Sequence, residues 1–308
     1  MILISLPKNP MDNFENFYST VPRHLTGPRP DNIGDTLIAP GIKHCEVYRR
    51  NTGWFRQSAL SIYVPSMESF IENSGKIKML ASLTGGVDNE MLKALEKTKD
   101  ENLKRNMLLN HADATMKELT FLKSNPDDWT YQNHLLLYLI ASNKLKIKYA
   151  ISRPFEGAKP ELFHEKCGYF KFPNNEKLSF LGNFNESKGS ISNHGERVAI
   201  STSRHIQLPG GPDERSITHN DSYDLDYFFK ELDRQWKGEQ EATEVFDINS
   251  ETLERIKEYS LSKEELLSRK KEEEEKRKKL VNLPLGRNIP RIPSTYNGSD
   301  FILRRHQK

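Results

Sequence analysis

A histidine and a lysine stand two residues apart, at His164 and Lys166, in the run ELFHEKCGYFKF that covers residues 161–172. The run alternates and is rich in aromatic residues, which favours a β-strand. Side chains two apart share one face of a strand, so the imidazole and the ammonium group would sit roughly 6–7 Å apart along it. An imidazole can attack phosphorus, and an ammonium group can neutralise the non-bridging oxygens of the same phosphate. The spacing therefore suits one phosphodiester.

The same alternation predicts which neighbours accompany the pair. One face would carry Leu162, His164, Lys166 and Gly168, and the other Phe163, Glu165, Cys167 and Tyr169. A turn at Pro173-Asn174-Asn175 and a returning strand at 177–181 complete a hairpin. Asn183 and Asn185 follow it, where amide side chains can donate to a phosphate. Glu196 precedes another strand-like run and can orient a histidine through its ring N–H.

A lone His-x-Lys pair is common on solvated strands, but the ordered set is more specific. At these residues the sequence resembles the phospholipase D-like superfamily, in particular the single-motif nuclease domains N-terminal to DEAD/DEAH-type helicases in bacterial phage-defence and restriction systems. The family pattern is His-x-Lys, then Gly-Ser-x-Asn-Glu-Ser/Thr, then Asn-x-x-Glu before a strand. It carries over to His164, Lys166, Gly182, Asn185, Glu186, Ser187, Asn193 and Glu196. Two positions depart from it: the superfamily's Asp falls at Lys171, and its Ser after Gly182 is Asn183.

The resemblance implies a mechanism without metal or other cofactor. That family needs two motifs per active site and this chain has one, so a homodimer is expected, with the two His164 strands meeting at a two-fold axis. One His164 would form a phosphohistidine, while the other would protonate the leaving oxygen and then activate water. Lys166 and Asn185 would stabilise the transition-state charge, and Glu196 would hold the ring tautomer. The expected substrate-binding residues are Asn183, Ser187, Asn193, Arg49 and Arg50.

Arg49 and Arg50 enter this list because they precede Gly53-Trp54-Phe55. Arginines beside aromatic residues can contact a nucleic-acid backbone. The alternative is that Trp54 and Phe55 are core residues and that the arginines are solvated.

Apolar periodicity predicts an α/β scaffold in which helices cover the faces of a sheet. The resemblance implies that this sheet is a phospholipase D-like mixed β-sheet flanked by helices, with an irregular N-terminal arm before it and a charged C-terminal helix after it. A strand around Cys45–Arg49, a helix over Ser58–Asn73 that Pro65 kinks or divides, and a buried strand over Ile77–Leu83 form a β–α–β unit. Further elements are expected at 87–122 and 129–143 (helices), 145–152 and 197–203 (strands), and 223–236 and 249–279 (helices). The predicted domains are an irregular arm over 1–30, the phospholipase D-like domain over 31–248, a charged connector helix over 249–282 and a tail over 283–308.

The composition indicates the cellular compartment in which we expect the protein. The 308 residues carry a net charge of +3, which permits nucleic-acid contact without demanding it. Two cysteines imply no disulfide framework, and no secretory signal or membrane-spanning run is present, so we expect a cytoplasmic protein without membrane contact. No His, Cys, Asp or Glu spacing reads as a metal site, since the position that a zinc-protease motif needs for its second His is Gly168.

The tail suggests a partner. Leu303-Arg304-Arg305-His306-Gln307 looks like the opening of a helicase core in the resembling family, yet no phosphate-binding Gly-x-x-x-x-Gly-Lys-Ser/Thr loop occurs. The resemblance therefore implies a metal-independent phosphodiesterase or nuclease acting on DNA, associated with a helicase domain or subunit in antiviral defence or restriction. The alternative is a catalytically silent DNA-binding or helicase-docking module of the same fold.

Overall fold

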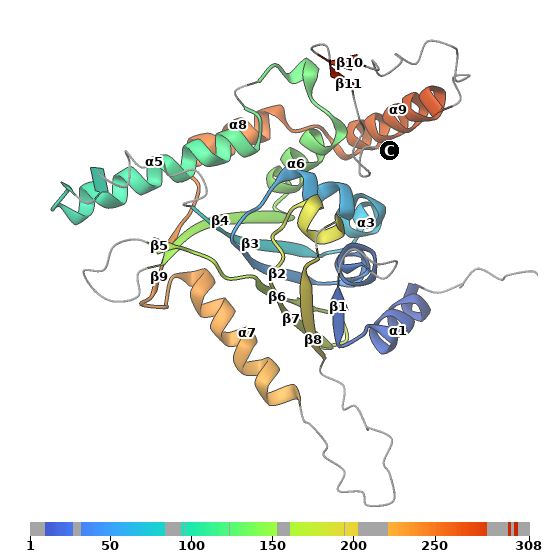
Figure 1. The fold of residues 1–308 in the computed structure, drawn as a ribbon, viewed down its shortest axis with the longest axis horizontal. Helices are drawn as coiled ribbons and strands as arrows, with labels where there is room; N and C mark the ends of the chain where they lie inside the picture. The colour runs from blue at the N-terminus through green and yellow to red at the C-terminus, as the bar shows by residue number, and fades with distance from the viewer. Residues whose placement is uncertain are drawn as a thin grey trace, which may run out of the picture. The chain divides into compact units, whose positions relative to one another are not determined.

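The computed structural model describes residues 10–26, 32–83, 94–95, 97–122, 124–152, 161–193, 195–202, 221–281, 295–296 and 299–300. The chain divides into two units, residues 1–263 and 264–308. The first unit contains the sheet and every candidate site residue (Figure 1).

The sheet of the first unit is mixed. Its strands run in the order β1-β8-β7-β6-β2-β3-β4-β5, and β9 also pairs with β4. The pairs β2–β3 and β3–β4 are parallel, and the remaining pairs are antiparallel. The strands are β1 (His24–Thr26), β2 (Val47–Thr52), β3 (Lys76–Ser82), β4 (Leu145–Ser152), β5 (Glu161–Leu162), β6 (Cys167–Lys171), β7 (Lys177–Gly182), β8 (Arg197–Thr202) and β9 (Thr243–Phe246).

Helices flank both faces of this sheet, which confirms the predicted α/β class (Figure 1). They are α1 (Pro10–Thr20), α2 (Ala39–His44), α3 (Leu60–Glu72), α5 (Glu101–Leu119), α6 (Tyr131–Ala141), α7 (Asp221–Lys237) and α8 (Ser250–Tyr259). Short helical turns are η1 (Gly34–Ile38), η2 (Gln57–Ala59), η4 (Pro126–Asp128) and η5 (Gly189–Asn193). The second unit holds α9 (Lys263–Val281, which begins at the last residue of the first unit) and an antiparallel pair, β10 (Thr295–Tyr296) and β11 (Ser299–Asp300).

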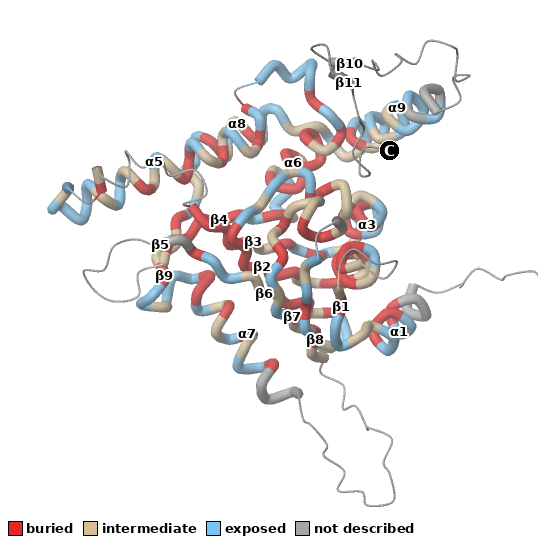
Figure 2. Tube along the Cα trace, in the orientation of Figure 1, coloured by how far each residue is buried: buried red, intermediate tan, exposed pale blue. Residues whose placement is uncertain are grey.

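Alternate side chains of β6 face opposite sides of the sheet, and a different helix covers each side. Cys167 and Tyr169 pack against Leu225, Phe229 and Leu232 of α7. Phe170 points the other way, and its ring lies so close to Gly41 of α2 that a methyl group there would be 2.6 Å away. The buried residues accordingly gather along the strands and the inward faces of the helices (Figure 2).

The sequence predicted an irregular N-terminal arm, but the structure has a helix and a strand there. Residues 10–20 form α1, and His24–Thr26 pairs with β8 as an edge strand. Phe14, Phe17 and Tyr18 lie at helical spacing and pack around Phe172 in tilted or edge-on orientations. This i, i+3, i+4 apolar pattern explains the helix, because packing outweighs the prolines that flank it.

The predicted connector helix over 249–282 is two helices. The break lies at residues 260–262, between α8 and α9. Asn249 caps α8 by accepting a hydrogen bond from the Thr252 N–H at 2.7 Å, and the Thr252 hydroxyl donates to Asp113 of α5 at 2.6 Å. Residues 249–263 therefore belong to the unit of the sheet, and the proposed tail motif at 303–307 lies outside the described residues.

Two other helices differ in detail from the prediction. α3 continues through Pro65 without division. α6 begins after Thr130, whose hydroxyl and N–H both bond the Asn133 side chain, while Asp127 and Asp128 form the turn before it. Among the helices that the structure describes, none combines the length and apolar character needed to cross a bilayer.

Candidate functional site

His164 and Lys166 lie in a crossing segment, residues 163–166, rather than within one continuous strand. β5 pairs with the end of β4 at Ile151, and β6 pairs with the end of β2 at Asn51. The chain must therefore pass over the carboxyl ends of the three parallel strands between residues 162 and 167. The predicted strand over 161–172 is interrupted because its two halves have different partners.

Alternate side chains of the crossing segment nevertheless face opposite ways, as predicted. Phe163 is buried with Leu80, Ala150 and Trp236 on the α7 side. Glu165 accepts hydrogen bonds from Asn51 Nδ2 at 2.7 Å and from Gln235 Nε2 at 2.8 Å.

These contacts anchor the crossing segment to β2 and α7. No local pattern in the sequence indicates this anchor, because Asn51 and Gln235 are remote from residues 163–166 in the chain.

His164 and Lys166 meet on the other side of the crossing segment. His164 Nε2 lies 2.5 Å from Lys166 Nζ. The ring's Nδ1 faces Gly53: a methyl group there would lie 3.5 Å from Nδ1 and 3.1 Å from Asn185 Oδ1. Three of the four predicted catalytic residues are thus brought together: His164 and Asn185 lie beside Gly53, the residue that follows β2, and Lys166 contacts the His164 ring.

The Asn185 side chain is held by the backbone of Trp54. Its Oδ1 accepts a hydrogen bond from the Trp54 N–H at 3.2 Å. This assignment leaves Nδ2 as a donor, and no hydrogen bond joins it to another described residue. A donor beside the imidazole of His164 can bind a phosphate oxygen.

Glu196 acts on Lys166 electrostatically. The pKa of Lys166 is lowered mainly by burial, while the Glu196 carboxylate favours the charged form and Arg50 opposes it. The Glu196 charge thus acts on a residue of the site. Its expected part in fixing the His164 ring stays a prediction.

The sequence predicted that Arg49 and Arg50 contact the substrate. This prediction is wrong, because both side chains are fully buried. The Arg49 guanidinium lies 4.8 Å from the ring centroid of Trp236, and burial lowers its pKa to about 10. The alternative was wrong too: Trp54 is 39% exposed, and the arginines are not solvated.

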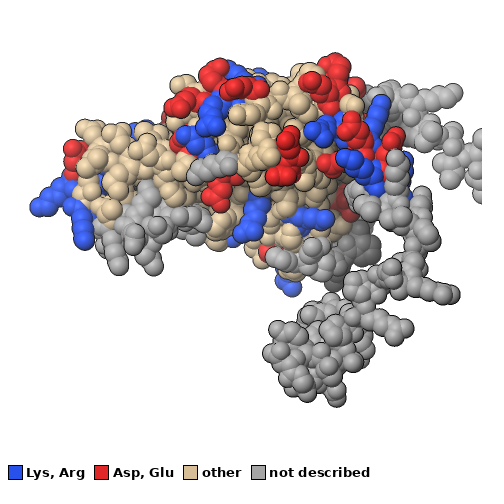
Figure 3. Space-filling model, turned by 90° about the horizontal axis from the view of Figure 1, so that it is seen from above, with Lys and Arg blue, Asp and Glu red and all other residues tan. Residues whose placement is uncertain are grey.

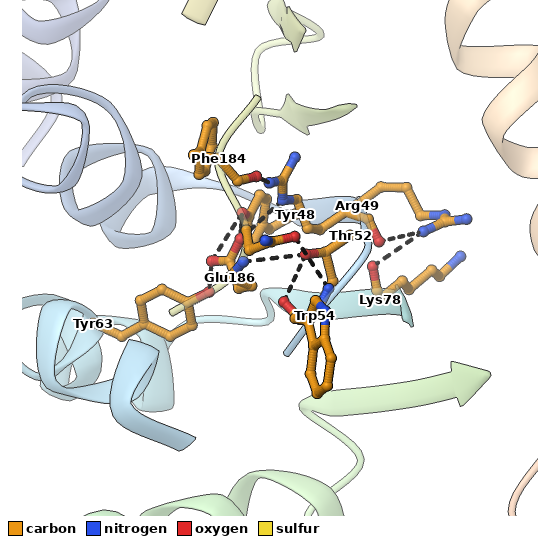
Figure 4. A network of polar contacts seen from close by, with 10 residues as sticks. Tyr48, Arg49, Thr52, Trp54, Tyr63, Lys78, Phe184 and Glu186 are labelled. Carbon is orange, nitrogen blue, oxygen red and sulfur yellow. Dashed lines mark hydrogen bonds and ion pairs between the residues drawn. The ribbon is translucent and has the colours of Figure 1, made fainter. Parts of the chain in front are cut away.

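Arg50 belongs to a buried network centred on Glu186 (Figure 4). Arg50 Nε lies 2.8 Å from Glu186 Oε2, and its NH2 group donates to the Phe184 carbonyl at 2.6 Å. The Tyr48 and Tyr63 hydroxyls donate to the same carboxylate. Burial first, and then the Glu186 charge, raises the pKa of both tyrosines, so they remain neutral donors.

The network fixes the loop that carries Asn185. The Glu186 N–H donates to Thr52 Oγ1 at 3.1 Å and to the Trp54 carbonyl at 3.0 Å. The sequence offered one signal for it: Tyr48 and Arg50 share a face of β2, where a buried cation requires an anion.

The three other predicted binding residues have structural contacts. Asn183 Oδ1 accepts from the Arg197 N–H at 2.7 Å, which ties the loop to β8. Ser187 Oγ accepts from the Ser190 N–H at 3.3 Å at the start of η5. Asn193 ends η5, and its side chain lies outside the described residues. Their roles toward a substrate stay predictions.

Outside the candidate site, positively and negatively charged side chains are interspersed. Lys171, at the motif Asp position, pairs with Glu46 at 3.2 Å at the far end of β6. On the face drawn in Figure 3, basic and acidic side chains alternate without a single-sign patch. Among the described residues, no three His, Cys, Asp or Glu side chains gather as a metal site would require.

Neither a protein-family model nor a curated protein matches the chain. Solved structures do. NucT from Helicobacter pylori is 11% identical with a TM-score of 0.36, over 68% of this chain and 92% of that one. Nuc, a phospholipase D family member from Salmonella typhimurium, is 10% identical with a TM-score of 0.34, over 70% and 93%. A phosphatidylserine synthase from Haemophilus influenzae Rd KW20 is 12% identical with a TM-score of 0.38, over 84% and 46%.

Proposed function

We propose that this protein is a metal-independent phosphodiesterase that cleaves DNA through a phosphohistidine at His164. The observation that carries the proposal is the contact between His164 Nε2 and Lys166 Nζ beside Asn185. A nucleophile, a cation and a neutral donor thereby lie around one imidazole ring. Phosphoryl transfer through a covalent intermediate can use these three groups.

The geometry suggests which nitrogen reacts. An ammonium group is a donor only, so its contact with Nε2 requires a lone pair there and places the ring proton on Nδ1. When substrate binds, the Lys166 ammonium group turns to the non-bridging oxygens and frees the Nε2 lone pair. Nε2 then attacks phosphorus, the N–P bond forms, and the P–O bond to the leaving group breaks. Lys166 and Asn185 Nδ2 stabilise the charge on the non-bridging oxygens.

A second acid–base group must complete the cycle. In the proposed homodimer it is His164 of the partner subunit, which must enter the reaction as the imidazolium and gives its extra proton to the leaving oxygen. It then takes a proton from the water that attacks the phosphohistidine and releases the product. The exposed Leu181 supports this arrangement, since it pairs with Cys167 beside Lys166 and lines a hollow with Phe228. An exposed apolar surface next to a half-complete site suits a second copy of the chain.

The biological setting in the proposal is a helicase–nuclease system of phage defence or restriction. Its support is the sequence resemblance of the His-x-Lys region and of residues 303–307. Co-purification of a helicase subunit with the tagged protein from its host would test this part, and a protein that purifies without any ATPase would contradict it.

The decisive experiment measures nicking of labelled single- and double-stranded DNA in the presence of a chelator. We expect wild-type cleavage to persist, His164→Ala to lose about a thousandfold or more, and Lys166→Met to lose about a hundredfold. His24→Ala is the matched control, because His24 is an exposed histidine on the edge strand β1.

Two outcomes would overturn the proposal. Complete inhibition by chelator would show that a metal is required. DNA binding without any cleavage would instead favour the silent docking module.

A further inference from the structure

A cavity of about 670 Å³ opens beside the candidate site. Its walls come from the residues that follow β2, from the end of β3, from Tyr149 of β4 and from one side of α5. It therefore lies at the carboxyl ends of the parallel strands, where open α/β sheets bind their ligands. Its volume falls in the range of small-molecule sites.

The lining suits a flat, uncharged ligand with polar edges. Trp54 and Phe121 are each 39% exposed, and the half-buried Leu119 adds apolar surface. The Tyr149 hydroxyl and Gln57 Nε2 are buried here without a hydrogen-bond partner among the described residues. Tyr149 is only 3% exposed, so its unsatisfied hydroxyl needs an explanation, and a bound ligand supplies one.

One wall of the cavity is the end of α5. Phe121 has a φ of +58°, the left-handed conformation that closes many helices, and the Leu122 N–H bonds the Lys117 carbonyl at 3.1 Å. This helix end places Phe121 in the cavity wall. The cavity also contains one acidic side chain, Glu118, and one basic one, Arg56, so it offers no net attraction to a phosphate.

The cavity adjoins the reacting groups directly. A methyl group on Gly53 would lie 3.5 Å from the His164 ring. The next residue, Trp54, bonds Asn185 through its N–H and lines the cavity. In Figure 4 the Trp54 indole points away from the Glu186 carboxylate. The backbone of one residue thus separates the catalytic groups from the aromatic wall.

We propose that this cavity binds a single unstacked base of a DNA strand, next to the phosphate that is cut. The inference rests on the proposed function and specifies its substrate. The base stacks on Trp54, and the Tyr149 hydroxyl and the Gln57 amide bond its edge. A base inside a duplex cannot enter, so the enzyme prefers single strands or frayed ends.

The test uses single-stranded oligonucleotides that carry one abasic residue, placed at successive positions. We expect wild-type kcat/KM to fall by about tenfold when the abasic residue flanks the cleaved phosphate. Trp54→Ala and the cavity-filling Ala114→Trp should cut intact and abasic strands at equal, low rates. Tyr227→Ala and Ala242→Trp are matched controls, because both residues are exposed and lie away from the cavity.

A binding measurement separates this inference from the proposed function. In His164→Ala, a thymidine trinucleotide should quench tryptophan fluorescence, and adding Trp54→Ala should remove the quenching, because Trp129 and Trp236 are buried. Quenching without any wild-type cleavage would reject the proposed function and keep the base site. Cleavage that ignores abasic residues, or trinucleotide binding that leaves the fluorescence unchanged, would reject the base site.

Discussion

Single side chains determine the chemistry that this site can perform. The Lys166 ammonium group lies against the His164 imidazole and is partly removed from water. Both conditions affect how readily Lys166 keeps its positive charge. Burial lowers the pKa of Lys166, and the Glu196 carboxylate partly offsets that loss. Glu196 therefore affects the site through the proton on Lys166.

That balance predicts a pH effect. Cleavage needs the ammonium form, so kcat/KM should fall as pH rises through the pKa of Lys166, which lies below that of a free lysine. Glu196→Gln removes the charge that favours the ammonium form, so the alkaline limb of the pH–rate profile should shift to lower pH. Glu258→Gln on the outer face of α8 should leave the profile unchanged. An alkaline limb that stays in place, or moves upward, in Glu196→Gln would remove Glu196 from this role.

Secondary-structure elements determine where those side chains lie. Glu186 joins three of them: Tyr48 and Arg50 come from β2, Tyr63 from α3, and Glu186 itself from the loop after β7. Because that loop also carries Asn185, the buried network positions a donor of the site. A buried carboxylate with three side-chain partners couples the local order of the site to the stability of the whole unit.

Removing the Glu186 carboxylate should therefore be costly. Glu186→Ala leaves the Arg50 guanidinium buried without its counter-charge, and we expect a loss of about 3–5 kcal/mol in the free energy of unfolding. Urea denaturation measures it, with Glu258→Ala as an exposed control. The double variant Arg50→Met/Glu186→Leu should lose less than the sum of its single changes, since it buries no lone charge. Additive losses would show that the pair does not act as a unit.

At the scale of the whole molecule, the open question is how many chains make one site. The single His-x-Lys pair supplies a nucleophile but no separate acid. Leu181 is 62% exposed on β7, beside the strand that follows Lys166. We expect this surface to be covered by a second copy.

A charge placed there should separate the subunits. In Leu181→Glu, sedimentation should shift from dimer to monomer and cleavage should fall together, because neither chain keeps an acid for the leaving oxygen. Leu103→Glu on α5, where the native leucine is 51% exposed, is the matched control and should remain dimeric and active. A monomer of Leu181→Glu with full activity would rule out the shared site.

The sequence by itself determined the class of the fold and the face that carries the chemistry. Apolar periodicity located the parallel β–α–β core and α7, and alternation put His164 and Lys166 opposite Phe163 and Glu165. These are local patterns, and each segment displays its own. The aromatic spacing of α1 carried the same kind of signal, and the flanking prolines hid it.

Only the tertiary structure decided the fate of the charged and polar residues. Arg49 and Arg50 look alike in sequence as exposed binding residues, yet both are buried, because Trp236, Phe184 and Glu186 arrive from distant parts of the chain. The interruption at 163–166 followed from strand pairing, and the cavity beside Trp54 arose where three strand ends meet α5. The physical reason is common to all of them: a buried polar group needs its partners, and the partners' positions are set by packing across the whole unit.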